Sequence, residues 1–323
     1  MEYEYFRCTQ PSMHKDNQKP MARSTPTNFE LGLDLENTHV LITGGKGHIG
    51  SVAVAAFVAA GARVSSLDYK HEVHTNTEPD PVGTAKGRGR LQQIHCDITD
   101  AASMTRAWDS ATRRFGVVES CITLAGRDLS TLEQTESLCD VDAASWLQVL
   151  QTNVGGTFLT AQLWLKGIRS HVESSSAISL RNLGLVLIGS EAGHFGVRTN
   201  AAYAASKSAV QGGLLQSLRA DAPGVHPRAR VNAVAPGPVD TTAFHSETGG
   251  PGTVEWWTEC EATTALRKPV AIESVARSLL FLASERWSAN VHGQVLNVDS
   301  GKQGAVMWPP PSDGQRRKVL SDG

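Results

Sequence analysis

The sequence predicts an α/β protein in which a doubly wound parallel sheet of about seven strands carries helices on both faces in a single domain. Short apolar runs alternate with longer segments of helical periodicity along most of the 323 residues, which is typical of a parallel sheet. Two of the runs, HVLIT and LGLVLI, are uniformly apolar, as buried parallel strands should be. A glycine-rich stretch, TGGKGHIG, joins the first run to the first helical segment.

These patterns assign the elements in order along the chain. Strands are expected at 39–43, 63–67, 91–95, 120–124, 184–188, 230–235 and 295–298. Helices are expected at 50–60, 101–115, 143–168, 201–222 and 272–283. The alternation of the two sets predicts crossover connections and hence helices on both faces of the sheet.

The domain is expected to occupy residues 37–301. Residues 1–36 are polar and aperiodic and are predicted to form a flexible N-terminal arm, and residues 302–323, with WPPPSDGQRRK, a flexible C-terminal tail. Two connections are long for a compact domain. Residues 70–90 are predicted to be mostly disordered, whereas residues 241–269, which contain VEWWTEC, are predicted to form a functional loop.

The composition excludes several classes of function. A formal net charge of −2 gives no reason to expect a nucleic-acid partner. The most apolar run, residues 52–62, is far shorter than the roughly 20 residues of a membrane span, so no membrane partner is expected. Five dispersed cysteines without a CxxC pair indicate reduced thiols. The start, MEYEYFRCTQ, lacks the pattern of a signal peptide, so the expected location is cytoplasmic.

The stretch TGGKGHIG, residues 43–50, has the form of a phosphate-binding loop between a strand and a helix. Gly44 is suited to a tight turn, Gly47 to the close approach of a pyrophosphate, and Gly50 to close packing of the helix on the strand. The helix N-terminus would face the anion. The context therefore predicts a Rossmann-type dinucleotide site bordered by Lys46, Gly47, His48 and Ile49, with a plain tight turn as the alternative.

An acidic residue follows the next expected strand, about 20 residues further on. Asp68 in GARVSSLD could accept hydrogen bonds from both ribose hydroxyls of NAD and would repel a 2′-phosphate. The alternative is NADP, because Lys46, Lys70 and the basic segment KGRGR could attract that phosphate. We therefore expect NAD, with NADP left open. After the third strand, Asp97 and Ile98 are placed to meet an adenine.

Tyr203 and Lys207 lie four residues apart on an expected helix, so they share one face. A tyrosine with an ordinary pKa near 10 is only about 0.1% ionised at neutral pH. A nearby ammonium favours the phenolate, and lowering the pKa by about three units takes roughly 4 kcal/mol. Such a tyrosine could exchange a proton with an alcohol or carbonyl oxygen while hydride moves to or from a nicotinamide.

Several motifs together resemble those of the short-chain dehydrogenase/reductase family, classical type, over residues 38–301. They are LQTNVGGTF, GSEAGHFGVRTNAAYAASK, RVNAVAPGPVDT and FLASERWSANVHGQVLNVDSG. The resemblance implies that Tyr203 is the catalytic acid/base and that Lys207 lowers its pKa and holds the nicotinamide ribose. It implies that Ser190 orients the substrate oxygen and that Asn153 holds a water in the proton relay. The residues that it places beside the nicotinamide are Pro236, Gly237, Val239 and Thr241.

The sequence departs from the family pattern at two places. The family's NNAG segment reads Thr123-Leu124-Ala125-Gly126, so both asparagines are lost, although Ala125 and Gly126 still allow close backbone approach. His48 stands where the classical loop TGxxxGxG has glycine, and TGGKGHIG fits the TGxxGxxG spacing of the family's extended branch. His48 is therefore expected at the loop edge. With no ligand partner spaced near it, no metal site is expected.

The resemblance implies an NAD(P)-dependent enzyme that interconverts a secondary alcohol and a ketone. Phe244, Trp256 and Trp257 are predicted to line a substrate pocket, with packing of the tryptophans on the core as the alternative; sugar alcohols remain open as substrates. A regulatory cofactor sensor on the same fold would be expected to lose Tyr203 or Lys207. An extended-type epimerase or dehydratase would carry a larger C-terminal substrate domain. By resemblance, a homo-oligomer, dimer or tetramer, is expected.

Overall fold

The computed structural model describes residues 29–72, 89–174 and 179–309. The described residues from Leu33 onward belong to one compact unit. Most of the connection that was expected to be disordered, residues 73–88, lies outside the described residues, as do residues 1–28 of the predicted arm.

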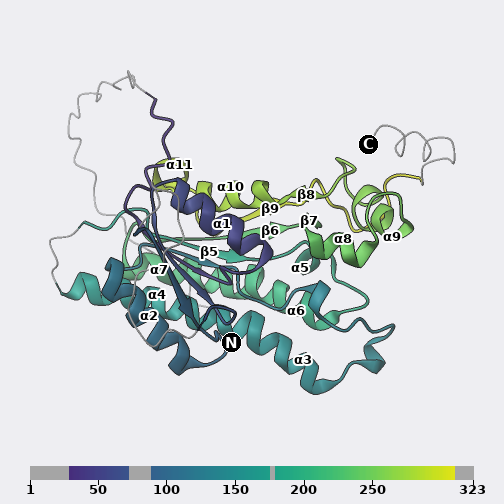
Figure 1. Cartoon of the computed structure of the whole chain (residues 1–323), viewed down its shortest axis with the longest axis horizontal. Coiled ribbons are helices and arrows are strands. Elements are labelled where there is room, and N and C mark those ends of the chain that lie inside the picture. Colours follow the sequence, from purple (N-terminus) through teal and green to yellow (C-terminus); the bar gives the residue numbers. More distant parts are fainter. Residues whose placement is uncertain (1–28, 73–88, 175–178, 310–323) are drawn as a thin grey trace, which may run out of the picture. The chain divides into compact units, whose positions relative to one another are not determined.

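A parallel sheet of seven strands forms the centre of this unit (Figure 1). Its order is β3 (Leu91–His95), β2 (Arg63–Asp68), β1 (His39–Thr43), β4 (Ser120–Thr123), β5 (Gly184–Ile188), β6 (Arg230–Pro236) and β9 (Val295–Val298). The expected strands are confirmed to within one residue at each end. The order reverses direction between β1 and β4, and doubly wound sheets place their ligand-binding crevice at the carboxyl ends of the strands at such a point.

Helices cover both faces of the sheet. On one face α1 (His48–Ala59) and α10 (Ile272–Ala283) lie side by side (Figure 1). On the other face lie α2 (Ala101–Phe115), α4 (Gly156–Glu173) and α7 (Leu215–Val225). The doubly wound architecture predicted from the alternating pattern is thereby confirmed.

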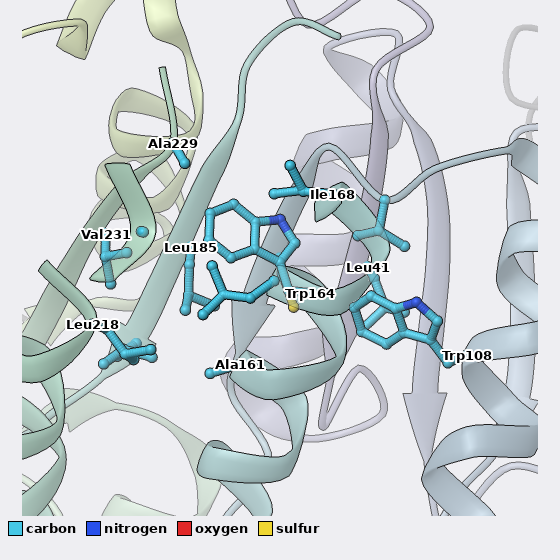
Figure 2. Close-up of a cluster of buried hydrophobic side chains, with 14 of the residues drawn as sticks. Leu41, Trp108, Ala161, Trp164, Ile168, Leu185, Leu218, Ala229 and Val231 are labelled. Atoms are coloured by element: carbon cyan, nitrogen blue, oxygen red, sulfur yellow. The ribbon is translucent and has the colours of Figure 1, made fainter. Parts of the chain in front are cut away.

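Two apolar clusters hold these layers together. The α1–α10 side buries Phe57 and Leu279 against Ile42 and Val186 of the central strands. On the opposite side, Trp164 of α4 is fully buried, and Figure 2 shows it among the labelled side chains of that cluster. The indole Nε1 of Trp164 donates to the carbonyl oxygen of Glu119 at 3.1 Å, so the one polar atom of this large side chain is paired.

The two long helices expected from the sequence are each interrupted by a π-helical turn. The first consists of α3 (Ala143–Leu150), a π turn (Gln151–Gly155) and α4. The second consists of α6 (Ala201–Ala209), a π turn (Val210–Leu214) and α7. π turns occur frequently at functional sites. The first contains Asn153 and the second contains Gln211, both of which are described below.

The substrate loop, residues 241–269, is more ordered than its length suggested. It contains α8 (Thr242–Thr248), α9 (Val254–Trp256) and a π turn (Trp257–Glu261), and β7 (Val239–Asp240) pairs with β8 (Val270–Ala271) at its base. Other short elements were not predicted: α5 (Ala192–Phe195), α11 (Glu285–Ser288) and single 3-10 turns at Leu129–Thr131 and Leu138–Asp140. Elements of this length bury too little periodic surface to be recognised from a sequence.

Both expected domain boundaries need correction. Leu35, assigned to the arm, is 1% exposed and belongs to the core. Lys302, assigned to the loose tail, pairs with Thr264 in a β-bridge, and the backbone N–H groups of Gln303 and Met307 donate to the carbonyl oxygens of Thr263 and Ala262. The ordered domain therefore extends beyond 37–301 at both ends, because these segments complete backbone hydrogen bonds of the substrate loop and the core.

Candidate active site

The glycine loop connects β1 to α1 at the carboxyl edge of the sheet. Gly44 has φ +73°, and a Cβ there would lie 2.6 Å from the backbone nitrogen of Ala125. A Cβ on Gly50 would collide with the carbonyl oxygen of Gly44. Both positions therefore require glycine, as the tight turn and the close packing of helix on strand demand. Gly45, to which no role was assigned, packs against the side chain of Ser66.

The tip of the loop is open. A Cβ on Gly47 would meet only the Gly44 carbonyl oxygen, at 3.2 Å. Gly47 is the N-cap of α1, and no side chain caps that helix. His48 is exposed at the first helical position and Ile49 is half-buried beside it. The amide groups of the first turn are thus available to an anion.

Asp68 ends β2 beside this loop and is 6% exposed. Its carboxylate accepts hydrogen bonds from the backbone N–H groups of Lys46 and Lys70, each at 2.9 Å. The Lys46 ammonium donates to the Lys70 carbonyl oxygen. Of the basic segment 86–90, the structure describes Arg90, which pairs with Glu36 near the amino ends of the strands.

Two further predicted cofactor segments follow β4 and β3. The N–H of Ala125 donates to Thr43 Oγ1 at 3.3 Å, which fixes the backbone between Leu124 and Gly126 against β1. Asp97 is exposed and accepts from the amide and hydroxyl of Thr99. Ile98 is buried against Gly156 of α4, so much of its side chain belongs to the core.

Tyr203 and Lys207 lie on α6, and both are buried. The helix begins at a side-chain cap: Asn200 Oδ1 accepts from the Tyr203 N–H at 3.0 Å. The Lys207 ammonium lies 5.6 Å from the centre of the Tyr203 ring and donates to the Ile188 carbonyl oxygen at 3.2 Å. The two side chains therefore share one face of the helix, directed at the end of β5.

Ser190 follows β5 and is 7% exposed. Its hydroxyl accepts from the Ala192 N–H, and its own N–H donates to Gln211 Oε1 at 2.8 Å. Gln211 lies in the π turn between α6 and α7, and Gly193 packs on its amide. Gln211 was not singled out in the sequence, because an extra residue in a helix turn leaves no visible pattern.

Asn153 is buried within the π turn between α3 and α4. Its side-chain amide forms two hydrogen bonds with the backbone of Arg127. Oδ1 accepts from the Arg127 N–H at 2.7 Å, and Nδ2 donates to the Arg127 carbonyl oxygen at 3.1 Å. Nδ2 also donates to Ser206 Oγ, and that hydroxyl donates to the Tyr203 carbonyl oxygen. Asn153 thereby ties the strand β4 loop to the helix of Tyr203.

Burial changes the acidity of this group. Desolvation raises the pKa of Tyr203 well above its ordinary value, and a hydrogen bond with Ser190 opposes the rise. Desolvation lowers the pKa of Lys207 to about 8, against the field of Asp128. The sequence led us to expect a lowered pKa at Tyr203. In this structure the pKa of Tyr203 is raised instead, because desolvation outweighs the hydrogen bond with Ser190.

The last residue of β6 and the residues after it border the same edge. The Pro236 carbonyl oxygen accepts from the Glu191 N–H, and the Gly237 N–H donates to the Val298 carbonyl oxygen. A Cβ on Gly237 would lie 2.8 Å from Asp299 Cα. Val239 pairs with Val270 in the short sheet, and Thr241 caps α8 through its hydroxyl.

The aromatic residues of the substrate loop do not behave alike. Trp256 is 5% exposed, stacks against Phe244 and His245, and donates from Nε1 to Glu261 at 2.9 Å. Trp256 was predicted to line the pocket, with packing on the core as the alternative, and its burial favours the alternative. Phe244 and Trp257 are half-buried, so parts of both side chains are accessible.

Residues 45–303 match a family model described as enoyl-(acyl carrier protein) reductase. The chain is 30% identical over 271 residues to 2-(S)-hydroxypropyl-CoM dehydrogenase 3 of Xanthobacter autotrophicus. The aligned region covers 83% of this chain and 97% of that protein. It is 28% identical over 287 residues to D-threitol dehydrogenase of Mycolicibacterium smegmatis, covering 87% and 98%. A solved short-chain type dehydrogenase/reductase from Mycobacterium ulcerans has a TM-score of 0.67 at 26% identity, covering 83% and 90%.

The chain therefore belongs to the short-chain dehydrogenase/reductase family. It is an oxidoreductase that acts on CH–OH groups of small molecules, and its family uses NAD(P). No side chain caps the N-terminus of α1 at Gly47, so the first amide groups of this helix fit a dinucleotide pyrophosphate. Across the described residues, no helix has the length and apolarity to cross a membrane. Nor does the described part of the chain group three or more His, Cys, Asp or Glu side chains that could hold a metal ion.

Proposed function

We propose that this oxidoreductase interconverts a secondary alcohol and a ketone, with Tyr203 as the group that gives or takes the proton. The observation that carries the proposal is the buried set of Ser190, Tyr203 and Lys207 at the carboxyl end of β5, where all three side chains have polar atoms within one small region. The named chemistry of two relatives, a 2-hydroxypropyl compound and threitol, also places an alcohol on a secondary carbon.

The geometry suggests distinct roles for these side chains. Tyr203 is protonated at its phenol oxygen at neutral pH, and burial raises its pKa further, so it can donate this proton to a ketone oxygen. The Ser190 hydroxyl, fixed by Ala192 and Gln211, orients that oxygen. Lys207 has a pKa of about 8, so its charge is easily adjusted, and it can favour the phenolate that remains. Asn153 positions the neighbouring backbone for a proton relay.

The nicotinamide cofactor, when bound, supplies or accepts the hydride. We expect the pyrophosphate at the open loop and α1 N-terminus, with Lys46, Gly47, His48 and Ile49 around it. Asp68 favours NAD over NADP, because a buried carboxylate beside the ribose would repel a 2′-phosphate. The remaining cofactor contacts that we propose are Asp97, Ile98, Ala125, Gly126, Lys207, Pro236, Gly237, Val239 and Thr241.

The substrate loop supports an apolar or mixed pocket wall. Phe244 and Trp257 are half-buried on this loop and are the aromatic side chains that we propose to contact substrate. We propose that Trp256 supports the loop that carries them, because it is buried and hydrogen-bonded within that loop.

A turnover assay tests the proposal. Purified protein should reduce NAD in the presence of one or more members of a panel of secondary alcohols that includes short 2-alkanols and tetritols, or oxidise NADH with the matching ketones. Tyr203→Phe should lower that turnover by about 10² to 10⁴-fold and leave the dissociation constant for NADH within about twofold of wild type. Turnover that survives Tyr203→Phe would overturn the assignment of the proton-transfer group.

A further inference from the structure

The carboxylate of Glu191 is held between three segments, directly after Ser190. It forms an ion pair with Lys302 at 3.5 Å, and the two side chains are only 17% and 11% exposed. Its Oε2 atom is buried and has no hydrogen-bond partner within the described residues. Its backbone N–H donates to Pro236. A carboxylate so enclosed and so incompletely paired is costly to bury, which indicates that its position serves the site beside it.

Lys302 makes a second contact, to the substrate loop. Its ammonium donates to the Glu259 carbonyl oxygen at 2.7 Å. Lys302 belongs to the closing segment, which we define as residues 299–308. Backbone N–H groups of Ala265 and Leu266 donate to Gly301 and Ser300 of this segment. At its far end Trp308 donates from Nε1 to the Thr264 carbonyl oxygen. Both ends of the closing segment therefore contact the second half of the substrate loop.

The same part of the chain also holds the serine turn, which we define as residues 190–195. His194 Nε2 lies 3.1 Å from Asn297 Oδ1. A Cβ on Gly304 would lie 3.0 Å from the ring of Phe195. Three side chains of the serine turn, Glu191, His194 and Phe195, are therefore in contact with β9 and the closing segment.

We propose that Lys302, through its ion pair with Glu191 and its hydrogen bond to Glu259, fixes the substrate loop against the serine turn, so that Glu191 and Lys302 are positioning residues for the reaction at Ser190. The proposal rests on the proposed function for its catalytic meaning. Its structural content, the coupling of two segments more than forty residues apart through one lysine, can be measured separately.

The charges around Glu191 make this coupling depend on pH. The groups that face it are Lys302 of the closing segment, Glu259 of the substrate loop and Asp299 after β9. Burial raises the pKa of Glu191 to about 7. The field of Glu191 in turn raises the pKa of Tyr203, so this carboxylate and the proposed catalytic phenol are electrostatically linked.

We call the arrangement with Glu191 packed against Lys302 closed, and the arrangement with Glu191 exposed to water opened. In the opened arrangement the pKa of Glu191 would return to its ordinary, lower value. The closed arrangement therefore binds the proton of Glu191 more tightly than the opened one. It gains stability relative to the opened one as pH falls through about 7, because protonation removes the cost of burying the Glu191 carboxylate, while Lys302 still donates to the Glu259 carbonyl oxygen and can donate to the neutral carboxyl group. This gain is lost as pH rises.

Backbone hydrogen exchange, followed by mass spectrometry on the cofactor-free protein, tests the coupling. Lys302→Met should accelerate exchange about tenfold or more, both in peptides that cover 259–267 and in peptides that cover 190–196. Lys302→Arg, which keeps the charge, should restore most of the protection. Lys166→Met is the matched control, because among the described residues that exposed lysine donates a hydrogen bond to Gln162 of its own helix and forms no ion pair. Faster exchange in the substrate loop alone, with an unchanged serine turn, would overturn the coupling.

A pH series supplies a readout that a purely structural role would not change. In wild type, exchange of both segments, corrected for intrinsic chemistry, should slow as pH is lowered from about 8 to about 6. Glu191→Gln, which keeps size and shape, should abolish that dependence. Retention of the full pH dependence in Glu191→Gln would contradict the proposal, as would additive effects of Glu191→Gln and Lys302→Met in a double-mutant cycle.

The outcome does not depend on whether the proposed reaction is right. If the two segments are coupled but no alcohol or ketone is turned over, the positioning contact stands and the proposed function fails. If turnover is found but Lys302→Met leaves exchange in both segments unchanged, the positioning contact fails and the proposed function stands.

Discussion

Tyr203 and Lys207 show how burial shapes the chemistry of single residues. Their spacing on one helix face could be predicted from the sequence, and the structure places both on α6 with the ammonium 5.6 Å from the phenol ring. The direction of the Tyr203 pKa shift could not be predicted, because desolvation is set by side chains from other elements. The same packing lowers the pKa of Lys207 to about 8.

Lys207 should leave a signature in the pH dependence of stability. Its pKa is lower in the folded protein than in the unfolded chain, so the unfolded chain binds more protons between these two values. The contribution of Lys207 to the free energy of unfolding should therefore rise by about 2 kcal/mol between about pH 7.5 and pH 10.

Urea unfolding at both pH values, for wild type and Lys207→Met, measures this effect. The stability of wild type relative to Lys207→Met should increase toward the higher pH. An unchanged difference would show that Lys207 is solvated in the folded protein.

Some of the other residues of the site carry no signal that a single sequence reveals, whereas Asn200 does. Glu191 and Lys302 lie more than a hundred positions apart and meet only through the fold. Gln211 reaches Ser190 from a π turn, and periodicity does not register the extra residue of such a turn. Asn200 was visible as a helix N-cap three residues before Tyr203, and a search for caps would have found it.

At the scale of elements, the sequence was most informative where one physical requirement dominates. Strands β1 and β5 are buried on both sides, so uniform apolarity marked them. The glycine loop was recognised because only glycine suits the turn at Gly44 and the crossing at Gly50. The short helices α5, α8 and α9 were not predicted, because they are too short to show a periodic apolar face. Of the three, α8 and α9 begin at side-chain caps.

The close packing of the glycine loop can be tested by a substitution at Gly50 and a matched control at Gly224, a glycine in α7. Gly50→Ala should lower stability by about 1 to 3 kcal/mol, because the new Cβ collides with the Gly44 carbonyl oxygen, and it should weaken NADH binding. Gly224→Ala in α7 meets no atom within 4 Å and should be neutral or stabilising by up to about 1 kcal/mol. Thermal unfolding with and without NADH compares the two, and equal effects would contradict the close packing at Gly50.

At the scale of the whole molecule, the strand order explains why distant segments meet. The sheet reverses direction between β1 and β4, so the glycine loop, the Thr123–Gly126 segment and the serine turn converge on the same carboxyl edge. The order itself follows from right-handed crossovers between parallel strands, which the alternating pattern of strands and helices implied. The ordered ends of the domain could not be predicted from this pattern, because Leu35 and Lys302 are held in place by tertiary contacts.

The expected homo-oligomer remains a prediction at this scale. Phe158 of α4 is 47% exposed, on the helix pair that includes Asn153. Light scattering should give a mass two or four times the 34.5 kDa of one chain, and Phe158→Glu should reduce it because a charge in an apolar interface is costly. A monomeric wild type would show that this face stays in water.

Titration of the cofactor-free protein with NADH and with NADPH, followed by nicotinamide fluorescence, tests the central claim most directly. We predict that NADH binds more tightly than NADPH, and that Asp68→Ala weakens NADH binding about tenfold or more through the loss of hydrogen bonds to a carboxylate. Circular dichroism should verify that Asp68→Ala still folds, since Asp68 also holds Lys46 and Lys70. Tighter binding of NADPH would contradict the role of Asp68, and binding of neither nucleotide would contradict a working dinucleotide site.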